Sequence, residues 1–371
     1  MIDLVQIRKE LHQIPELAFE EYKTQQYIMY KLQKYEGLEL YEFSPTGIFA
    51  AYNGGEGKYL LFRADMDALP LEERTGCNFA SQHEGVMHAC GHDMHITILL
   101  GLIDEVMTSR PQVNIIFVFQ PAEEGKGGAL RVLENPIWEK YQVKSAFALH
   151  VSPTLQAGEI SSRAGNFFAA TCEFDIVIKG KSAHIAIPEE GRNALQAGIE
   201  LYQCVQQLPK LVKSKEKFIC DFGVLNSGTA RNTIPVDCFM RGTIRAEDEQ
   251  KIKALKEALT GICESVAIAY GVDVEPKFLV EYKEVFNSQE LVNDLKAAAK
   301  ACDVRYHEAE PTMAGEDFGY FAGRWGGLLF WLGAADAGKN SLHNNHFLPD
   351  EKALAVGVKI MRQLINEIKG T

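Results

Sequence analysis

The spacing of apolar residues changes along the chain and divides the sequence into sections. Up to about residue 168, helical periodicity alternates with short apolar runs. Two of these runs, Val113–Phe119 and Ser145–Leu149, are unbroken, which indicates strands buried on both faces. We also expect helices over 3–13 and 20–35, a strand at Tyr59–Phe62, and a helix over Met94–Met107 with Asp93 as its N-cap. This alternation of strands and helices predicts an α/β fold with a largely parallel sheet.

The middle section follows a different pattern. Cys172–Lys179 alternates apolar and polar residues, which predicts a strand with one face in a core. The next elements are expected at 191–208 (helix), 218–225 and 236–245 (strands), 248–270 (helix) and 272–281 (strand). The order β-α-β-β-α-β is that of a ferredoxin-like module.

From about residue 285 the α/β pattern returns. We expect a helix over 288–301, a buried strand at Leu328–Leu332 and a final helix over 350–368. A chain of 371 residues is also long enough for two domains. We therefore predict one α/β domain formed by residues 1–168 and 285–371, with a ferredoxin-like (α+β) domain inserted at 169–284.

The charge and cysteine content limit the classes of partner and the compartment. Asp and Glu number 50 against 38 Lys and Arg, for a net charge of −12, which argues against nucleic acid and anionic membranes as partners. The N-terminus is a charged amphipathic helix without the apolar core of a signal peptide, and no segment reaches the roughly 18 apolar residues of a membrane span. Eight scattered cysteines favour a reducing compartment, so we expect a cytoplasmic protein.

The densest cluster of potential metal ligands is Met87–His95. Cys90 and His92 are two residues apart, and on a helix their side chains would point about 200° apart. They can serve one metal only from the turn before the helix, which Gly91 permits. Thiolate and imidazole together form a borderline-soft ligand set. The alternative is a buried cysteine beside exposed histidines.

Two adjacent glutamates, Glu123 and Glu124, follow the buried strand at 113–119. Open α/β sheets bind ligands at the carboxyl ends of their strands. One glutamate can ligate a metal while the other takes the proton of an attacking water. A solvated acidic loop is the alternative interpretation.

Further histidines complete the pattern. His150 closes a strand at the same edge of the sheet, and either His343 or His346 could supply a ligand from the C-terminal section. A lone histidine at a strand end is more often structural. Soft, acidic and imidazole ligands after three successive strands nevertheless predict a metal-dependent site.

Eight motifs are spread along nearly the whole chain: HQIPELAFEE (12–21), FRADMDALP (62–70), MHACGHDMH (87–95), FQPAEEGKGGA (119–129), ALHV (148–151), GKSAH (180–184), GEDFGYF (315–321) and LHNNHF (342–347). Through these motifs the sequence resembles the M20 family of metallopeptidases, in the amidohydrolase branch that includes hippurate hydrolases and plant auxin-conjugate hydrolases. Within the branch it is most similar to members that deacetylate N-acetyldiaminopimelate in bacterial lysine biosynthesis.

The resemblance implies two divalent metal ions, with zinc, manganese, cobalt and nickel all compatible with this branch. Glu123 would be the general base, and Asp65 would orient a metal ligand. Many family members have a metal-binding histidine where this chain has Arg63, which leaves the bridging ligand open. His343 is preferred to His346 because the final ligand of the family follows a leucine. The implied ligands are Cys90, His92, Glu124, His150 and His343.

The resemblance also implies that the inserted domain is a lid that forms a homodimer. His184 would reach the active site of the partner subunit and stabilise the oxyanion. Asn232 resembles a family residue near the substrate carbonyl or carboxylate. Arg245 is a candidate carboxylate fork from its chemistry, and a structural role at a strand end is the alternative for both residues. Glu316, with Asp317, would recognise a substrate ammonium group or else cap a helix.

These residues together predict a hydrolase that acts on a small N-acyl amino acid. Deacetylation of N-acetyldiaminopimelate is the leading hypothesis. The alternatives are a broader N-acyl amino-acid or hippurate hydrolase and a dipeptidase. A binding protein without catalysis is disfavoured because Glu123, the residue whose loss would abolish turnover, is present.

Overall fold

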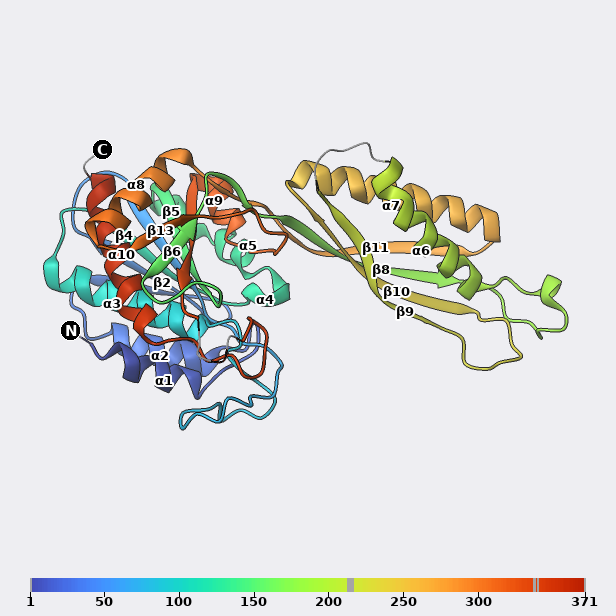
Figure 1. Ribbon diagram of the computed structural model, residues 1–371, viewed down its shortest axis with the longest axis horizontal. Helices are drawn as coiled ribbons and strands as arrows, with labels where there is room; N and C mark the ends of the chain where they lie inside the picture. The colour runs from blue at the N-terminus through green and yellow to red at the C-terminus, as the bar shows by residue number, and fades with distance from the viewer. Residues whose placement is uncertain (1, 212–216, 336–337, 339, 370–371) are drawn as a thin grey trace. The chain divides into compact units, whose positions relative to one another are not determined.

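The computed structural model describes residues 2–211, 217–335, 338 and 340–369. The chain forms two compact units (Figure 1): unit 1 consists of Met1–Phe167, Val285–Pro311 and Asp317–Thr371, and unit 2 of Phe168–Glu284 and Thr312–Glu316. The section expected as an insertion falls within unit 2, to which Thr312–Glu316 are added because Ala169 N–H donates to Ala314 O at 3.1 Å. None of the described helices is long and apolar enough to cross a lipid bilayer.

Unit 1 is built on a ten-stranded sheet. The main path runs β1-β2-β4-β3-β5-β14-β12-β7, while β6 pairs with β14 and β13 pairs with β6. The central strands β4, β3, β5, β14 and β12 are parallel neighbours, and the hairpin β1–β2 closes one side antiparallel. The strands are β1 (Leu38–Phe43), β2 (Gly47–Asn53), β3 (Tyr59–Asp65), β4 (Asn114–Gln120), β5 (Val143–Ser152), β6 (Glu159–Ser162), β7 (Gly165–Phe168), β12 (Val285–Asn287), β13 (Arg305–Glu308) and β14 (Gly327–Gly333).

Helices cover this sheet. In β4 all seven residues are buried, as its unbroken apolar run predicts. Helix α3 packs on β3, β4 and β5 and contacts α1 and α10, while α9 packs on β5, β12 and β14. The helices of unit 1 are α1 (Leu4–His12), α2 (Tyr22–Leu32), α3 (His92–Ser109), α4 (Glu123–Lys126), α5 (Gly128–Leu133), α8 (Gln289–Ala301), α9 (Gly319–Trp325) and α10 (Lys352–Lys369), with a 3₁₀ turn at Pro136–Lys140.

Unit 2 has the predicted β-α-β-β-α-β order. Its four antiparallel strands lie in the order β11-β8-β10-β9, and both helices pack on this sheet. In β8, Phe174, Ile176 and Ile178 are buried while Glu173 and Lys179 are exposed, which matches the period-two pattern. The elements are β8 (Ala170–Lys179), α6 (Ala194–Leu211), β9 (Ile219–Ser227), β10 (Asp237–Ala246), α7 (Glu249–Tyr270) and β11 (Asp273–Tyr282), with a 3₁₀ turn at Pro188–Glu190.

The predicted fold class is confirmed, but one local prediction is wrong. Asp93 is not an N-cap: α3 begins at His92, and Gly91 is the capping residue. The Asp93 carboxylate instead accepts hydrogen bonds from Arg8 Nε at 2.9 Å and His12 Nδ1 at 2.8 Å, so a tertiary ion pair takes the place of the local cap.

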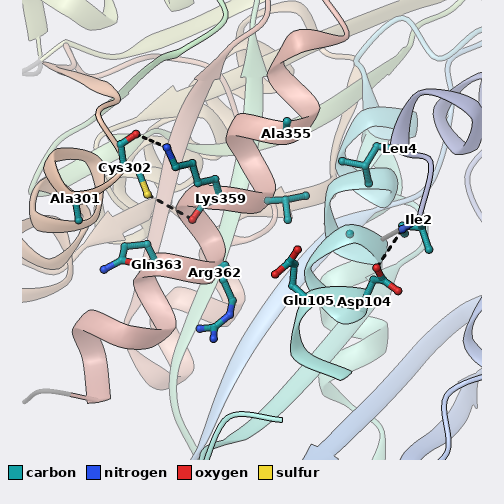
Figure 2. A pocket seen from close by; sticks show the side chains of 12 residues that line it. Ile2, Leu4, Asp104, Glu105, Ala301, Cys302, Ala355, Lys359, Arg362 and Gln363 are labelled. Atoms are coloured by element: carbon teal, nitrogen blue, oxygen red, sulfur yellow. Dashed lines mark hydrogen bonds between the residues drawn. The ribbon is translucent and has the colours of Figure 1, made fainter. Parts of the chain in front are cut away.

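A pocket of about 380 Å³ lies between the second half of α3, the end of α8 and α10 (Figure 2). Two of the charged residues that line the pocket form hydrogen bonds with other lining residues: Lys359 Nζ donates to Cys302 O at 2.6 Å, and Asp104 accepts the N–H of Ile2 at 3.1 Å. Gly101, on the pocket floor, is nine residues beyond the start of α3, roughly 14 Å along the helix. The pocket is therefore separate from the site at the helix start.

Candidate active site

A left-handed turn brings the first two ligands together. Gly91 has φ of +83°, and a Cβ at this position would lie 2.5 Å from Val151 Cγ2, so both conformation and space require glycine. This turn places Cys90 just before α3 and His92 at its first residue. Cys90 Sγ lies 3.3 Å from His150 Nε2 on β5, so segments 60 residues apart meet at the sheet edge.

The two histidines are held in the same way. His92 Nδ1 donates to Asp67 O at 2.9 Å, and His150 Nδ1 donates to Val151 O at 2.9 Å. These bonds leave Nε2 of each ring unprotonated in the neutral tautomer. His92 Nε2 is buried and has no hydrogen-bond partner among the described residues. Metal-binding histidines in proteins are commonly oriented by such a second hydrogen bond.

The acidic pair lies on a distorted turn after β4. Ala122 has φ of +56°, and Glu124 departs from helical geometry with φ of −73° and ψ of 94°. Glu124 Oε1 lies 3.2 Å from Nε2 of His343, although the His343 side chain is 53% exposed. The His346 side chain is exposed as well. The structure thus brings His343 to the site, as the leucine before it indicates.

The candidate ligands form overlapping groups whose donor atoms all lie within 4.8 Å of one another. Cys90, His92 and Glu124 each belong to two of the three groups below, so these three residues link the groups and the shared ligand stays open. The groups are Cys90–His92–His150, Cys90–Glu124–His343 and His92–Glu123–Glu124.

The electric field of the site favours positive charge. Burial lowers the pKa of His92, but the carboxylates of Asp65, Asp67 and Glu124 outweigh it and raise this pKa to about 10. Burial, and then the Glu124 and neighbouring carboxylates, raise the pKa of the Cys90 thiol well above its ordinary value. Thiol, imidazole and carboxylate donors, a buried unpartnered nitrogen and a surplus of negative charge together fit a divalent metal centre.

Two carboxylates that sequence reasoning missed hold the acidic turn. Asp67 accepts the backbone N–H groups of Glu123 at 3.1 Å and Glu124 at 2.9 Å. Glu21, fully buried, accepts the N–H of Ala122 at 2.8 Å and a bond from the Thr46 hydroxyl. In the sequence, Asp67 and Glu21 stand out only as members of the RADMDALP and HQIPELAFEE motifs. Membership in a motif does not reveal that their carboxylates bind backbone N–H groups of residues 122–124.

Arg63 occupies a structural position. Its guanidinium donates to Asp65 Oδ2 at 2.6 Å, Asp317 Oδ1 at 2.8 Å and Gln120 Oε1 at 2.8 Å. Asp317 also accepts the N–H of Ala129 in the first turn of α5 at 2.9 Å. Asp317 therefore joins distant segments and caps a helix, the second of the two roles considered for this acidic pair.

Asp65 is hydrogen-bonded to a histidine that the sequence did not single out. Its Oδ1 accepts a bond from His95 Nδ1 at 2.6 Å and lies 3.7 Å from His92 Nε2. His95 Nε2 accepts the N–H of Val151 at 3.0 Å, so both ring nitrogens of His95 are engaged. The His95 ring packs edge-on against His150, with centroids 4.7 Å apart. The expected orienting role of Asp65 stays a prediction, and its direct bond is to His95.

The other predicted site residues lie in unit 2. His184 and Asn232 are exposed and lie on two paired segments: Ile185 N–H donates to Asn232 O at 3.0 Å, and His184 forms a β-bridge with Thr233. Arg245 is half-buried and donates from Nη1 to Met313 O at 2.8 Å, while Glu316 is buried. The roles of these four residues stay predictions.

The fold and the converging donors define a class of metal-dependent amide hydrolases, and the comparisons with known proteins agree. The model of peptidase family M20/M25/M40 matches residues 61–367. The N-acetyldiaminopimelate deacetylase of Bacillus subtilis is 37% identical over 367 residues, covering 97% of this chain and 96% of the relative. The enzyme of that name from Streptococcus pneumoniae is 36% identical over 374 residues, covering 99% of each.

Solved structures give the same result. A dinuclear metal-binding M20 peptidase from Bacillus subtilis has a TM-score of 0.83 at 30% identity, covering 97% of this chain and 96% of that one. A protein described as an aminohydrolase, from methicillin-resistant Staphylococcus aureus, has a TM-score of 0.90 at 27% identity, covering 98% and 95%. The chain belongs to peptidase family M20/M25/M40 and is a hydrolase acting on amides.

The support from Glu21 can be tested by comparing two substitutions. Burial, and to a lesser extent the nearby Asp67, raise the pKa of Glu21 to about 7, so a neutral side chain with the same shape should be tolerated. Glu21→Ala removes the acceptor for Ala122 N–H and should lower kcat about 10- to 100-fold. Glu21→Gln should retain most of kcat. Equal losses in the two variants, measured as steady-state rates at equal metal content, would contradict this role.

Proposed function

We propose that unit 1 holds two divalent metal ions and that the protein hydrolyses an N-acyl amide. The observation that carries this proposal is the convergence of five donor side chains, in which His92, His150, Glu124 and His343 gather around Cys90. When bound, such ions polarise a carbonyl and lower the pKa of water towards about 7. Zinc, manganese, cobalt or nickel would suit the donor set, and the thiolate favours zinc. The ligands would be Cys90, His92, Glu124, His150 and His343.

Glu123 is the proposed general base. Its carboxylate belongs to the group formed with His92 and Glu124, and Asp67 fixes its backbone. It would take the proton of the attacking water and return it to the leaving nitrogen. Glu124 lies beside His343, another proposed ligand. Glu124 can therefore bind the metal while Glu123 serves as the base.

His184 is the proposed oxyanion donor. Its Nδ1 accepts the N–H of Ala186 at 3.1 Å, so the proton of the neutral ring is on Nε2. The exposed Nε2–H can donate to a carbonyl oxygen as negative charge grows on it. Asn232, held beside it by backbone pairing, would bind the same end of the substrate.

We propose N-acetyldiaminopimelate as the substrate, giving acetate and diaminopimelate in lysine biosynthesis. The support is the name shared by relatives that match this chain over nearly its whole length. Such a substrate offers carboxylates and an ammonium group, for which Arg245 and Glu316 are the candidate partners. A hippurate-type N-acyl amino acid and a dipeptide are the competing substrates.

We further propose a homodimer formed through unit 2, in the cytoplasm. The outer strand β9 exposes Val224 and Leu225, and α6 exposes Ile199 and Tyr202, which leaves apolar surface for a second copy. Eight free cysteines are consistent with a reducing compartment. The net charge of −12 disfavours nucleic acid and anionic membrane surfaces as partners.

A parallel assay tests the substrate. The purified protein, supplied with a divalent metal, should hydrolyse N-acetyldiaminopimelate with a kcat/KM at least about tenfold above that for hippurate or a dipeptide, because only the first matches charged partners at both ends. Released amine is measured in each case. A higher kcat/KM for hippurate or the dipeptide would replace this substrate assignment.

Glu123→Gln tests the base. The amide keeps the shape but cannot take a proton, so kcat should fall by about 10²- to 10⁴-fold while metal content is unchanged. Rates and metal analysis on the same sample check both parts. Wild-type turnover in this variant would mean that another group is the base.

Mixing subunits tests the shared site. His184→Ala and Glu123→Gln subunits are each nearly inactive, but a dimer of one with the other has one site with both groups intact if His184 acts across the interface. Random exchange makes half of the dimers mixed, so activity should recover to about one quarter of wild type. No recovery after verified exchange would place His184 in the active site of its own subunit or outside it.

A further inference from the structure

A second group of metal-ligating side chains lies in unit 1, outside the candidate metal centre. His12 ends α1, and Glu73 and Cys77 lie in the segment after β3. One donor atom from each lies within 4.8 Å of the other two. We propose that His12, Glu73 and Cys77 bind a third divalent cation, zinc or an ion of similar softness, in a site that we call the loop site.

The distances suit a tetrahedral ion. His12 Nε2 is 3.3 Å from Glu73 Oε1, and Cys77 Sγ is 3.8 Å from the same oxygen. Ligands at ordinary zinc bond lengths and tetrahedral angles are separated by about 3.3 Å for nitrogen and oxygen, and by about 3.5 Å for oxygen and sulfur. The two separations from Glu73 Oε1 are therefore within a few tenths of an ångström of the tetrahedral values, and all three donors lie within 4.8 Å of one another. A small inward movement would let them share one ion, with water in the fourth position.

Two of the ligands are oriented in advance. His12 Nδ1 is bound to Asp93 Oδ2 at 2.8 Å, and both side chains are fully buried. This bond directs Nε2 towards Glu73, in the carboxylate–histidine–metal arrangement common at zinc sites. Glu73 Oε2 accepts the N–H of Ser81 at 2.7 Å, while Oε1 faces His12 and Cys77 and also accepts a bond from the Thr75 hydroxyl, so the cation would share this oxygen with Thr75. The cation would replace the proton between His12 and Glu73 and that of the Cys77 thiol, releasing both.

The loop site would brace an unusual segment. Residues 71–86 contain no helix or strand, and irregular loops of this length are uncommon inside compact domains. Arg74 N–H donates to Asn345 O at 2.8 Å, so this loop contacts the segment that carries His343. An ion held by His12 on one side and by Glu73 and Cys77 on the other would fasten the loop to α1. The role assigned is structural and does not depend on the proposed substrate.

Cobalt spectroscopy separates the loop site from the pair of metals. In a Cys90→Ser protein loaded with Co²⁺, a thiolate-to-cobalt charge-transfer band should remain, because Cys77 still supplies one thiolate. Adding Cys77→Ser should abolish that band and lower bound cobalt by one ion per chain. Adding Cys204→Ser instead should change neither, because Cys204 is an equally half-buried cysteine whose Sγ lies 3.7 Å from Glu200 Oε1, with no histidine in the pair.

Each outcome decides a separate point. If the Cys90→Ser protein shows no thiolate band, or keeps the band after Cys77→Ser, the loop site is refuted. If Cys77→Ser alone removes the entire band from the otherwise unaltered protein, the loop site stands and the assignment of Cys90 as a ligand fails. Circular dichroism of each variant checks that the fold is retained.

Discussion

The structure of unit 1 depends on the compensation of buried carboxylates. Asp65, Asp67, Glu21 and Asp93 are each at most 1% exposed, and an ionised carboxylate without partners in such a place would cost several kcal/mol. Asp65 and Asp93 each accept bonds from a guanidinium and an imidazole, Asp67 accepts two backbone N–H groups, and Glu21 accepts a backbone N–H and a hydroxyl. Two of these carboxylates, Asp67 and Glu21, also hold the turn that carries Glu123 and Glu124. The hydrogen bonds that stabilise the buried carboxylates therefore also position the candidate catalytic residues.

Periodicity predicted the elements that pack as regular units. The buried run at Val113–Phe119 and the alternating run at Cys172–Lys179 each identified a strand and its burial, because these patterns follow from the backbone geometry itself. The hairpin β1–β2 and the short strands β6 and β13 were missed. In β1 burial is mixed, and β6 and β13 have only four residues each, so none of these shows a clear period. β2 is a buried run whose apolar residues were not recognised as a strand.

The donor residues could be named from the sequence, but the groups that hold them could not. Cys90 and His92 were recognisable because only a turn at Gly91 allows them to serve one metal. Asp67 and Glu21 act through backbone N–H groups of residues 56 or more positions away, and no local pattern predicts such a bond. Asp93 was assigned a local cap for the same reason: its true partners, Arg8 and His12, lie more than 80 residues earlier.

The order of strands in unit 1 also constrains how the chain can be synthesised. One edge of β5 pairs with β3, which precedes it, but the other pairs with β14, whose residues Gly327–Gly333 come after the whole of unit 2, its short return segment Thr312–Glu316 included. Until those residues leave the ribosome, the Phe147 and Leu149 region has an open hydrogen-bonding edge of the kind that promotes aggregation. The insertion thus lengthens the time during which the edge of β5 is unpaired and must be kept from aggregating. The chain would therefore need chaperones for longer than an uninterrupted α/β domain.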